Sequence, residues 1–118
     1  MNADTDHTPS IAVDLDGTLA YYDHWRGIEH IGPPIIAMRD RVRQWLRDGK
    51  RVIIFTARIT GEHEGKARAY IEQWLWQNDI GITEITNIKQ PHMVQFWDDR
   101  AVAIRQNTGE FMLFPMVL

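Results

Sequence analysis

The sequence predicts an α/β protein with one mainly parallel sheet and helices on its faces. Short apolar runs without a helical period alternate with longer segments in which apolar residues recur every three or four positions. Such alternation is typical of parallel sheets, because parallel neighbours need a crossover connection. The 118 residues are enough for a single three-layer core and too few for two such cores.

Four apolar runs are predicted as strands, because they are short and lie between turn residues. The first contains Ile11-Ala12-Val13, and the second contains the run Val-Ile-Ile-Phe at positions 52–55. Continuous apolar runs of this length suit strands that are buried on both faces. The turn formed by residues 107–109, Asn-Thr-Gly, further predicts a hairpin near the C-terminus. The predicted strands are residues 10–14, 51–56, 85–89 and 94–97, followed by hairpin arms at 101–104 and 111–113.

Two segments have the spacing of amphipathic helices. The first follows Pro34, which suits a first helical turn, and ends at Gly49. The second runs from about residue 61 to residue 78. Trp76 lies almost opposite the apolar stripe of the second helix, so we expect it to be exposed and to indicate a contact between copies in a homo-oligomer. The two stripes consist of Ile35, Met38, Val42, Trp45 and Leu46, and of Ala67, Tyr70, Ile71, Trp74 and Leu75.

The composition argues against several classes of protein. A formal net charge of -3 disfavours a dedicated nucleic-acid binder and leaves nucleic acid as a substrate only. The absence of cysteine excludes disulfides, thiol catalysis and cysteine-based zinc sites. No apolar run reaches the roughly 18 residues that cross a bilayer, and residues 1–9 lack the apolar core of a signal peptide. We therefore expect a cytoplasmic protein without a membrane partner, with a flexible arm at residues 1–9 and one domain at residues 10–118.

In a parallel α/β sheet, ligands bind beyond the carboxyl ends of the strands. The first predicted strand ends in residues 14–18, Asp-Leu-Asp-Gly-Thr. The carboxylates of Asp14 and Asp16 would repel each other there, and a divalent cation such as Mg²⁺ would offset the repulsion. Gly17 and Thr18 allow a sharp turn whose amides can face an anion. A lone Asp-x-Asp is more often a cap or an Asx-turn, so the other strand ends decide its meaning.

The other three strand ends carry residues of matching chemistry. Thr56 and Arg58 follow the second strand, and Lys89 follows the third. The adjacent acids Asp98 and Asp99 follow the fourth. Each residue alone has a plain structural explanation, as a cap, a solvated lysine or a turn. Together they bring two acid pairs, a hydroxyl and an amine to one edge of the sheet, and this combination suits phosphoryl transfer.

The segment between the first strand and the first helix, residues 19–32, is rich in aromatic residues. One interpretation is a flap that closes on the leaving group, in which Tyr22, Trp25 and Arg26 contact the substrate together with Arg58. The alternative is that Trp25 and a tyrosine pack on the edge of the sheet. The residues by themselves favour neither interpretation.

Four motifs, in this order, resemble those of the haloacid dehalogenase superfamily. Residues 13–19, Val-Asp-Leu-Asp-Gly-Thr-Leu, resemble its first signature, and residues 55–58, Phe-Thr-Ala-Arg, are similar to its second. Lys89 stands in the place of the third, and residues 96–99, Phe-Trp-Asp-Asp, resemble the two-aspartate form of the fourth. The resemblance spans residues 11–105 and implies a Rossmann-like three-layer sandwich with a five-stranded sheet. The short excursions imply a member without a cap domain.

The resemblance also implies a role for each matching residue. Asp14 would attack phosphorus and become an aspartyl-phosphate, while Asp16 would act as general acid and then as general base. Thr56 and Lys89 would hold the oxygens of the transferred phosphoryl group.

A Mg²⁺ cofactor is implied by the same resemblance. Asp14, Asp98 and the backbone carbonyl of Asp16 would be its ligands, and Asp99 would support the site or reach the metal through water.

The expected function is therefore a Mg²⁺-dependent phosphomonoester hydrolase. Asp16 favours a phosphatase over a dehalogenase or a phosphonate-cleaving enzyme, because the leaving group of a phosphomonoester needs a proton. A nucleotide or a terminal phosphate of nucleic acid is the preferred substrate, with sugar phosphates and phosphoproteins as alternatives. A receiver-like or non-catalytic phosphate-binding module is the remaining alternative. A receiver would end its third strand in an aspartate, whereas residues 87–89 here are Asn-Ile-Lys.

Overall fold

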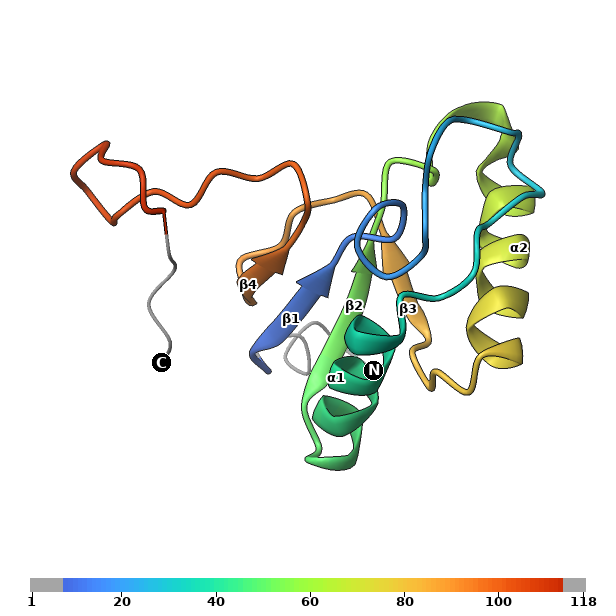
Figure 1. The fold of residues 1–118 in the computed structure, drawn as a ribbon, viewed down its shortest axis with the longest axis horizontal. Helices are drawn as coiled ribbons and strands as arrows, with labels where there is room; N and C mark the ends of the chain where they lie inside the picture. Colours follow the sequence, from blue (N-terminus) through green and yellow to red (C-terminus); the bar gives the residue numbers. More distant parts are fainter. Residues whose placement is uncertain (1–7, 114–118) are drawn as a thin grey trace.

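The computed structural model describes residues 8–113, in which four strands form one parallel sheet (Figure 1). The order across the sheet is β3-β2-β1-β4, so β1 and β2 are central. The predicted α/β class and parallel sheet are confirmed. In chain order the elements are β1 (Ser10–Val13), α1 (Ile36–Arg47), β2 (Arg51–Phe55), the 3₁₀ turn η2 (Gly61–His63), α2 (Glu64–Gln77), β3 (Glu84–Thr86) and β4 (Met93–Trp97).

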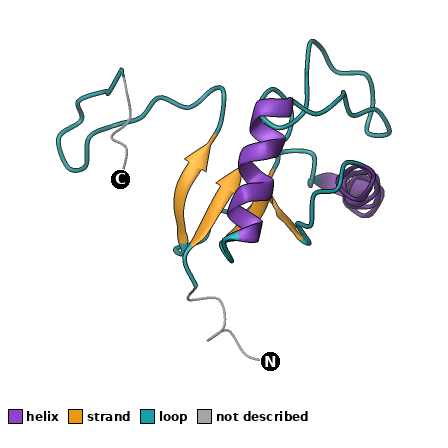
Figure 2. Cartoon of the chain, turned by 60° about the horizontal axis from the view of Figure 1, so that its bottom comes forward, coloured by secondary structure: helices purple, strands orange, loops and turns teal. Residues whose placement is uncertain are grey.

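Both helices pack on the same face of the sheet (Figure 2). The chain steps from β1 to β2 to β3 in one direction, and right-handed crossovers then place both connecting helices on one side. Met38 of α1 and Ile71 of α2 accordingly share one core with Val13 and Ile54 of the central strands.

The opposite face carries only a small cluster of buried side chains, with Ala12 and Ile53 at its centre. No helix crosses this face in the described residues, because the connection from β3 to β4, residues 87–92, is too short to form one. The described part of the chain therefore has two layers, and the expectation of three layers was wrong.

The expected fifth strand is also absent from the described residues. The predicted C-terminal hairpin is reduced to one antiparallel bridge between Ile104 and Phe111, around a turn in which Asn107 and Gly109 have positive φ. Residues 98–113 extend away from the sheet, so the arms of the hairpin have no strand to pair with (Figure 1). Strand β3 is shorter than expected because the Thr86 hydroxyl accepts the Ile88 N–H at 3.0 Å, which turns the chain out of the ladder.

The helices lie where the apolar spacing predicts them. Helix α1 begins two residues after Pro34, and α2 begins after the 3₁₀ turn that starts at Gly61. Tyr70 is 38% exposed although it was assigned to the buried stripe. Trp76 is 80% exposed, as its position predicts, and its role in an interface stays a prediction. Neither described helix combines the length and apolar character needed to cross a bilayer.

The predicted flap is closed at its base by a short set of backbone hydrogen bonds. Tyr21 N–H donates to the Pro33 carbonyl at 2.8 Å, and Ile35 N–H donates to the Leu19 carbonyl at 2.8 Å. Trp74 of α2 adds an indole N–H bond to the Gly32 carbonyl at 2.9 Å. The two ends of the flap therefore approach closely at Gly32, where a Cβ atom would lie 2.1 Å from the Tyr21 carbonyl oxygen.

We expect Gly32→Ala to lower the free energy of unfolding by about 1–3 kcal/mol, since the methyl group would force the two ends of the flap apart. Urea denaturation of the two proteins measures the difference. Gly81→Ala is the matched control, because a Cβ there meets nothing within 4 Å and φ is not positive. Equal stability of the two variants would contradict the close approach at Gly32.

Candidate functional site

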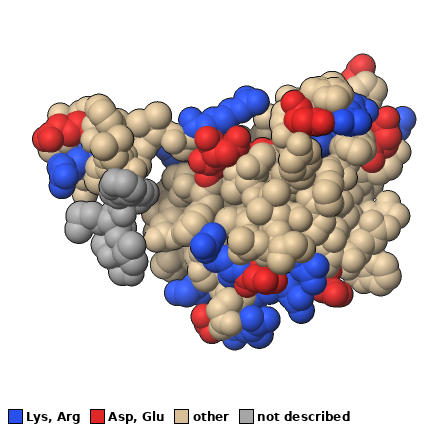
Figure 3. All heavy atoms as spheres, in the orientation of Figure 1, with Lys and Arg blue, Asp and Glu red and all other residues tan. Residues whose placement is uncertain are grey.

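An open cavity of about 620 Å³ lies at the carboxyl ends of the strands. It brings together four of the residues that the sequence singled out for chemistry or metal binding, Asp14, Asp16, Thr56 and Asp98. Acidic and basic atoms gather side by side at this rim, above the ends of β1 and β4 (Figure 3). The full lining is Asp14, Asp16, Tyr22, Phe55, Thr56, Ala57, Arg58, Thr60, Asn87, Asp98 and Arg100.

Three carboxylates form a cluster at one side of this cavity. Asp14, Asp98 and Asp99 each place one oxygen within 4.8 Å of the others. The cluster forms because β1 and β4 are neighbours in the sheet, with Asp14 N–H donating to the Trp97 carbonyl at 2.9 Å. The sequence predicted this meeting of the first and fourth motifs.

Asp99 is fixed to the turn that follows β1. The Thr18 hydroxyl donates to Asp99 Oδ1 at 3.1 Å and accepts the Asp99 N–H at 3.0 Å. Gly17 makes this approach possible, since its φ is +90° and a Cβ would lie 2.6 Å from Asp99 Oδ2. Thr18 thus acts between the two motifs, a role that the sequence alone did not indicate.

The environment of Asp14 disfavours its charged form. Partial burial raises its pKa to about 7, with further contributions from the charge of Asp98 and from a side-chain hydrogen bond with Asp99. The Leu15 N–H bond to Asp14 acts in the opposite direction. A carboxylate placed so that its charge is costly is one that gains from a cation.

The three clustered carboxylates could hold a metal ion. Carboxylate oxygens are the ligands that Mg²⁺ prefers, and opposite ligands of one ion stand about 4 Å apart. In the cluster of Asp14, Asp98 and Asp99, one oxygen of each residue lies within 4.8 Å of the others, so one ion could be shared among them. The Asp16 carboxylate does not belong to the cluster, so only its backbone carbonyl remains available for the metal role expected of it.

Thr56 is held at the end of β2 with its hydroxyl on the cavity. Its N–H donates to the Thr86 carbonyl at 2.9 Å, and its side chain is 4% exposed. The hydroxyl oxygen accepts the Arg58 N–H at 3.2 Å. The hydroxyl hydrogen is therefore left to donate into the cavity that Thr56 lines.

Lys89 does not line the cavity. Its ammonium lies 4.8 Å from the centroid of the Phe96 ring, and Phe96 in turn contacts Phe55 on the face that carries no helix. Arg100 and Asn87 line the cavity instead, and neither was predicted from the sequence as a site residue. Arg100 directly follows the acid pair of the fourth motif, and that position could have indicated it.

Arg58 and Asp16 form a bidentate ion pair. Arg58 Nε donates to Asp16 Oδ2 at 2.7 Å, and Nη2 donates to Asp16 Oδ1 at 2.9 Å. The Arg58 side chain is only 4% exposed. Arg58 was expected to bind substrate, and the structure gives it a protein carboxylate as partner.

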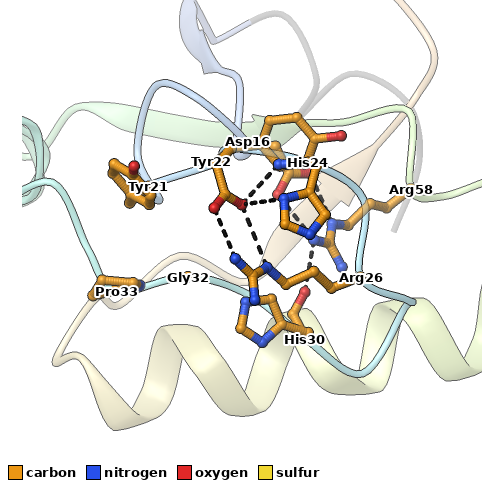
Figure 4. Close-up of a pocket in the computed structure, with 10 residues that line it drawn as sticks. Asp16, Tyr21, Tyr22, His24, Arg26, His30, Gly32, Pro33 and Arg58 are labelled. Atoms are coloured by element: carbon orange, nitrogen blue, oxygen red, sulfur yellow. Dashed lines mark hydrogen bonds and ion pairs between the residues drawn. The ribbon is translucent and has the colours of Figure 1, made fainter.

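A second cavity of about 330 Å³ lies between the flap and Asp16 (Figure 4). Tyr22, Asp16 and Arg58 line both cavities, so the two adjoin. Within the flap, Arg26 pairs with Asp23 at 2.7 Å, and this contact holds the pKa of Asp23 down at about 2. The whole lining is Asp16, Tyr21, Tyr22, Asp23, His24, Arg26, His30, Gly32, Pro33 and Arg58.

Trp25 lies outside both cavities and is 52% exposed. Its ring lies 4.8 Å from the Arg58 guanidinium carbon, a cation–π contact. Trp25 therefore packs on Arg58 rather than on the edge of the sheet, while Tyr22 lines both cavities.

Comparison with known proteins supports the fold. The chain resembles the solved structure of a conserved protein from Bacteroides thetaiotaomicron, with a TM-score of 0.58 and 23% sequence identity. The similarity covers 80% of this chain and 78% of that one. No family model and no curated protein matches the chain.

We expect Asp14→Asn to stabilise the protein in the absence of metal. The folded-state pKa of Asp14 is raised, so its ionisation opposes folding, and wild-type stability falls as pH rises from about 4 through about 7. The variant should be more stable than wild type by about 1–2 kcal/mol at pH 8, allowing for solvent screening, and should match it near pH 4. Urea denaturation with a chelator, at both pH values, measures this difference.

The matched control is Asp40→Asn, which removes an exposed carboxylate of α1. Adding Mg²⁺ at pH 8 should stabilise the wild type and leave Asp14→Asn unchanged. A stability gain that is the same at pH 4 and pH 8 would contradict the raised pKa.

Proposed function

We propose that this protein is a magnesium-dependent phosphomonoester hydrolase that acts through an aspartyl-phosphate on Asp14, in the manner of the haloacid dehalogenase superfamily. The observation that carries the proposal is the convergence of Asp14, Asp98 and Thr56 on one cavity at the carboxyl ends of the strands. Three clustered carboxylates beside a buried hydroxyl suit a cation together with a phosphoryl group.

The reaction has two steps. An Asp14 oxygen attacks phosphorus, the bond from phosphorus to the leaving oxygen breaks, and protonated Asp16 gives its proton to that oxygen. In the second step Asp16, now ionised, takes a proton from a water that attacks the phosphorus of the aspartyl-phosphate. Inorganic phosphate leaves, and the Asp14 carboxylate and protonated Asp16 are restored.

Asp14, Asp98 and the Asp16 carbonyl would hold Mg²⁺, with Asp99 in support. When bound, the ion would neutralise the clustered carboxylates and polarise the phosphoryl oxygens. Asp99 suits the supporting role because Thr18 already holds its carboxylate.

Thr56 and a cation would bind the remaining phosphoryl oxygens. The Thr56 hydroxyl hydrogen is left to donate to a phosphoryl oxygen, and Thr56 and Arg100 both line the cavity. Lys89 would join them by leaving the Phe96 ring, a movement that its long flexible side chain permits. Both cations would offset the negative charge that the acidic cluster and the phosphate bring together.

The flap supports a substrate with a sizeable leaving group. The smaller cavity adjoins the larger one at Asp16 and Tyr22, so a group attached to the phosphate extends toward Tyr22 and Arg26. Phenol and imidazole rings in that lining suit the planar base of a nucleotide or of a nucleic-acid end.

Asp14→Asn should abolish Mg²⁺-dependent phosphate release, because no covalent intermediate can form. Asp16→Asn should lower turnover by about 10²–10⁴-fold, the range that a positioned acid or base contributes, while still allowing slow phosphorylation of Asp14. A screen of nucleotides, 3′- and 5′-phosphorylated oligonucleotides and sugar phosphates, followed by intact-mass analysis of the protein, measures both effects. Full turnover by Asp14→Asn would refute the proposed function.

Asp98→Ala should raise the Mg²⁺ concentration at half-maximal activity more than Asp99→Ala does. Asp98 lines the cavity, whereas Asp99 lies against Gly17 and Thr18. Titration of activity with Mg²⁺ in the two variants gives the order. The reverse order would identify Asp99 as the direct ligand.

A further inference from the structure

Arg58 is the most heavily bonded side chain of the site. It is 4% exposed and engages the flap as well as Asp16 (Figure 4). Nη2 donates to the His30 carbonyl at 2.8 Å, and Nη1 donates to the Ile28 carbonyl at 3.2 Å. With the two bonds to Asp16, four of its five N–H groups are used within the protein. The Trp25 ring covers one face of the guanidinium.

We propose that Arg58 is a positioning residue, which orients the Asp16 carboxylate for proton transfer and anchors the flap above it. This inference rests on the proposed function for its consequence in catalysis, and on the contacts alone for the anchoring of the flap. It replaces the role in substrate binding that the sequence suggested for Arg58.

The contacts leave little of Arg58 for a phosphate. Its charge is already neutralised by the Asp16 carboxylate, in the bidentate geometry that guanidinium groups favour. Replacing that partner with a phosphoryl group would leave the Asp16 carboxylate without its cation beside three other acidic groups. Arg58 is therefore better suited to orienting Asp16 than to binding a phosphate.

Asp16 is oriented by this pair without being blocked. The Asp16 carboxyl group has about four acceptor sites when ionised, and one O–H donor plus the remaining acceptor sites when protonated. Arg58 occupies two acceptor sites, one on each oxygen, so the pair can hold either form. The carboxylate lines both cavities, so its remaining sites face the space that the phosphate and its leaving group would fill. A bidentate pair removes free rotation of the carboxylate, which is what accurate proton transfer requires.

Arg58 is itself held on a rigid part of the protein. Its N–H donates to the Thr56 hydroxyl, and the next residue, Ile59, is 1% exposed in the core. The flap, in contrast, has no helix or strand of its own in residues 21–32. Trp74 ties the base of the flap to α2, and Arg58 ties Ile28 and His30 of the flap to the end of β2. One residue thus connects the flap, the acid and the central sheet.

The test compares Arg58→Gln and Arg58→Lys with wild type on a series of aryl and alkyl phosphates whose leaving groups differ in basicity. Basic leaving groups need a proton from Asp16, and weakly basic ones such as 4-nitrophenolate do not. We expect kcat/KM of Arg58→Gln, which covers the steps up to release of the leaving group, to fall by about 10²-fold on alkyl phosphates and by less than about 5-fold on 4-nitrophenyl phosphate. The loss in Arg58→Lys should be intermediate, because lysine keeps the positive charge but cannot form the two parallel hydrogen bonds to the carboxylate.

Arg51→Gln is the matched control. Arg51 lies at the other end of β2 and also forms a bidentate pair with a carboxylate, Glu84, at 2.8 and 2.5 Å. Its loss should leave the dependence on the leaving group unchanged. Asp16→Asn should show the same dependence as Arg58→Gln, and the double variant should be no worse than Asp16→Asn alone.

Amide hydrogen exchange tests the anchoring of the flap without any substrate. Residues 21–31 should exchange faster in Arg58→Gln than in wild type, and no faster in Arg51→Gln. An equal loss of kcat/KM on every phosphate, or unchanged exchange in the flap, would overturn the inference while Mg²⁺-dependent hydrolysis by wild type upheld the proposed function. If the wild-type protein hydrolysed none of these phosphates, both the proposed function and the catalytic part of the inference would be refuted. Amide hydrogen exchange would then test only whether Arg58 anchors the flap.

Discussion

Repulsion among the carboxylates at the ends of β1 and β4 is the constraint on which the rest of the site depends. A parallel sheet brings the carboxyl ends of neighbouring strands to one edge. Asp14, Asp98 and Asp99 are therefore close together although their carboxylates repel one another. The raised pKa of Asp14 expresses the cost of that meeting. The Thr18 hydroxyl, which donates to Asp99, and the Leu15 N–H, which bonds to Asp14, reduce this cost.

The Asp16 carboxylate lies outside the cluster because it pairs with the Arg58 guanidinium. Residues 14 and 16 lie on the same turn, yet the bidentate pair with Arg58 draws the second carboxylate toward the flap. The site thus separates two acids that are adjacent in sequence into two environments, one beside other carboxylates and one beside a guanidinium. Such different environments would let the two acids take the separate roles of nucleophile and proton-transfer group that the proposed function gives them.

The face of the sheet that carries no helix affects the site as well. The short connection from β3 to β4 leaves Phe55 and Phe96 in contact there, and the Lys89 ammonium lies over the Phe96 ring. The same connection brings β4 beside β1 and so creates the acidic cluster. The position of Lys89 and the position of the cluster are therefore two consequences of one crossover.

Local patterns in the sequence determined the α/β class, the two helices, the four strands and the residues at their carboxyl ends, because burial imposes a period that can be read from neighbouring residues. Tertiary structure alone decided the rest. The predicted hairpin at 101–113 forms only one bridge, because no strand of the sheet pairs with its arms. A local sequence pattern does not show whether such a neighbour exists. Arg58 bonds to Asp16, which is 42 residues away in the sequence, and Thr18 bonds to Asp99, which is 81 residues away. Such partners are chosen by the geometry of the folded sheet, since contacts so distant in sequence leave no periodic signal.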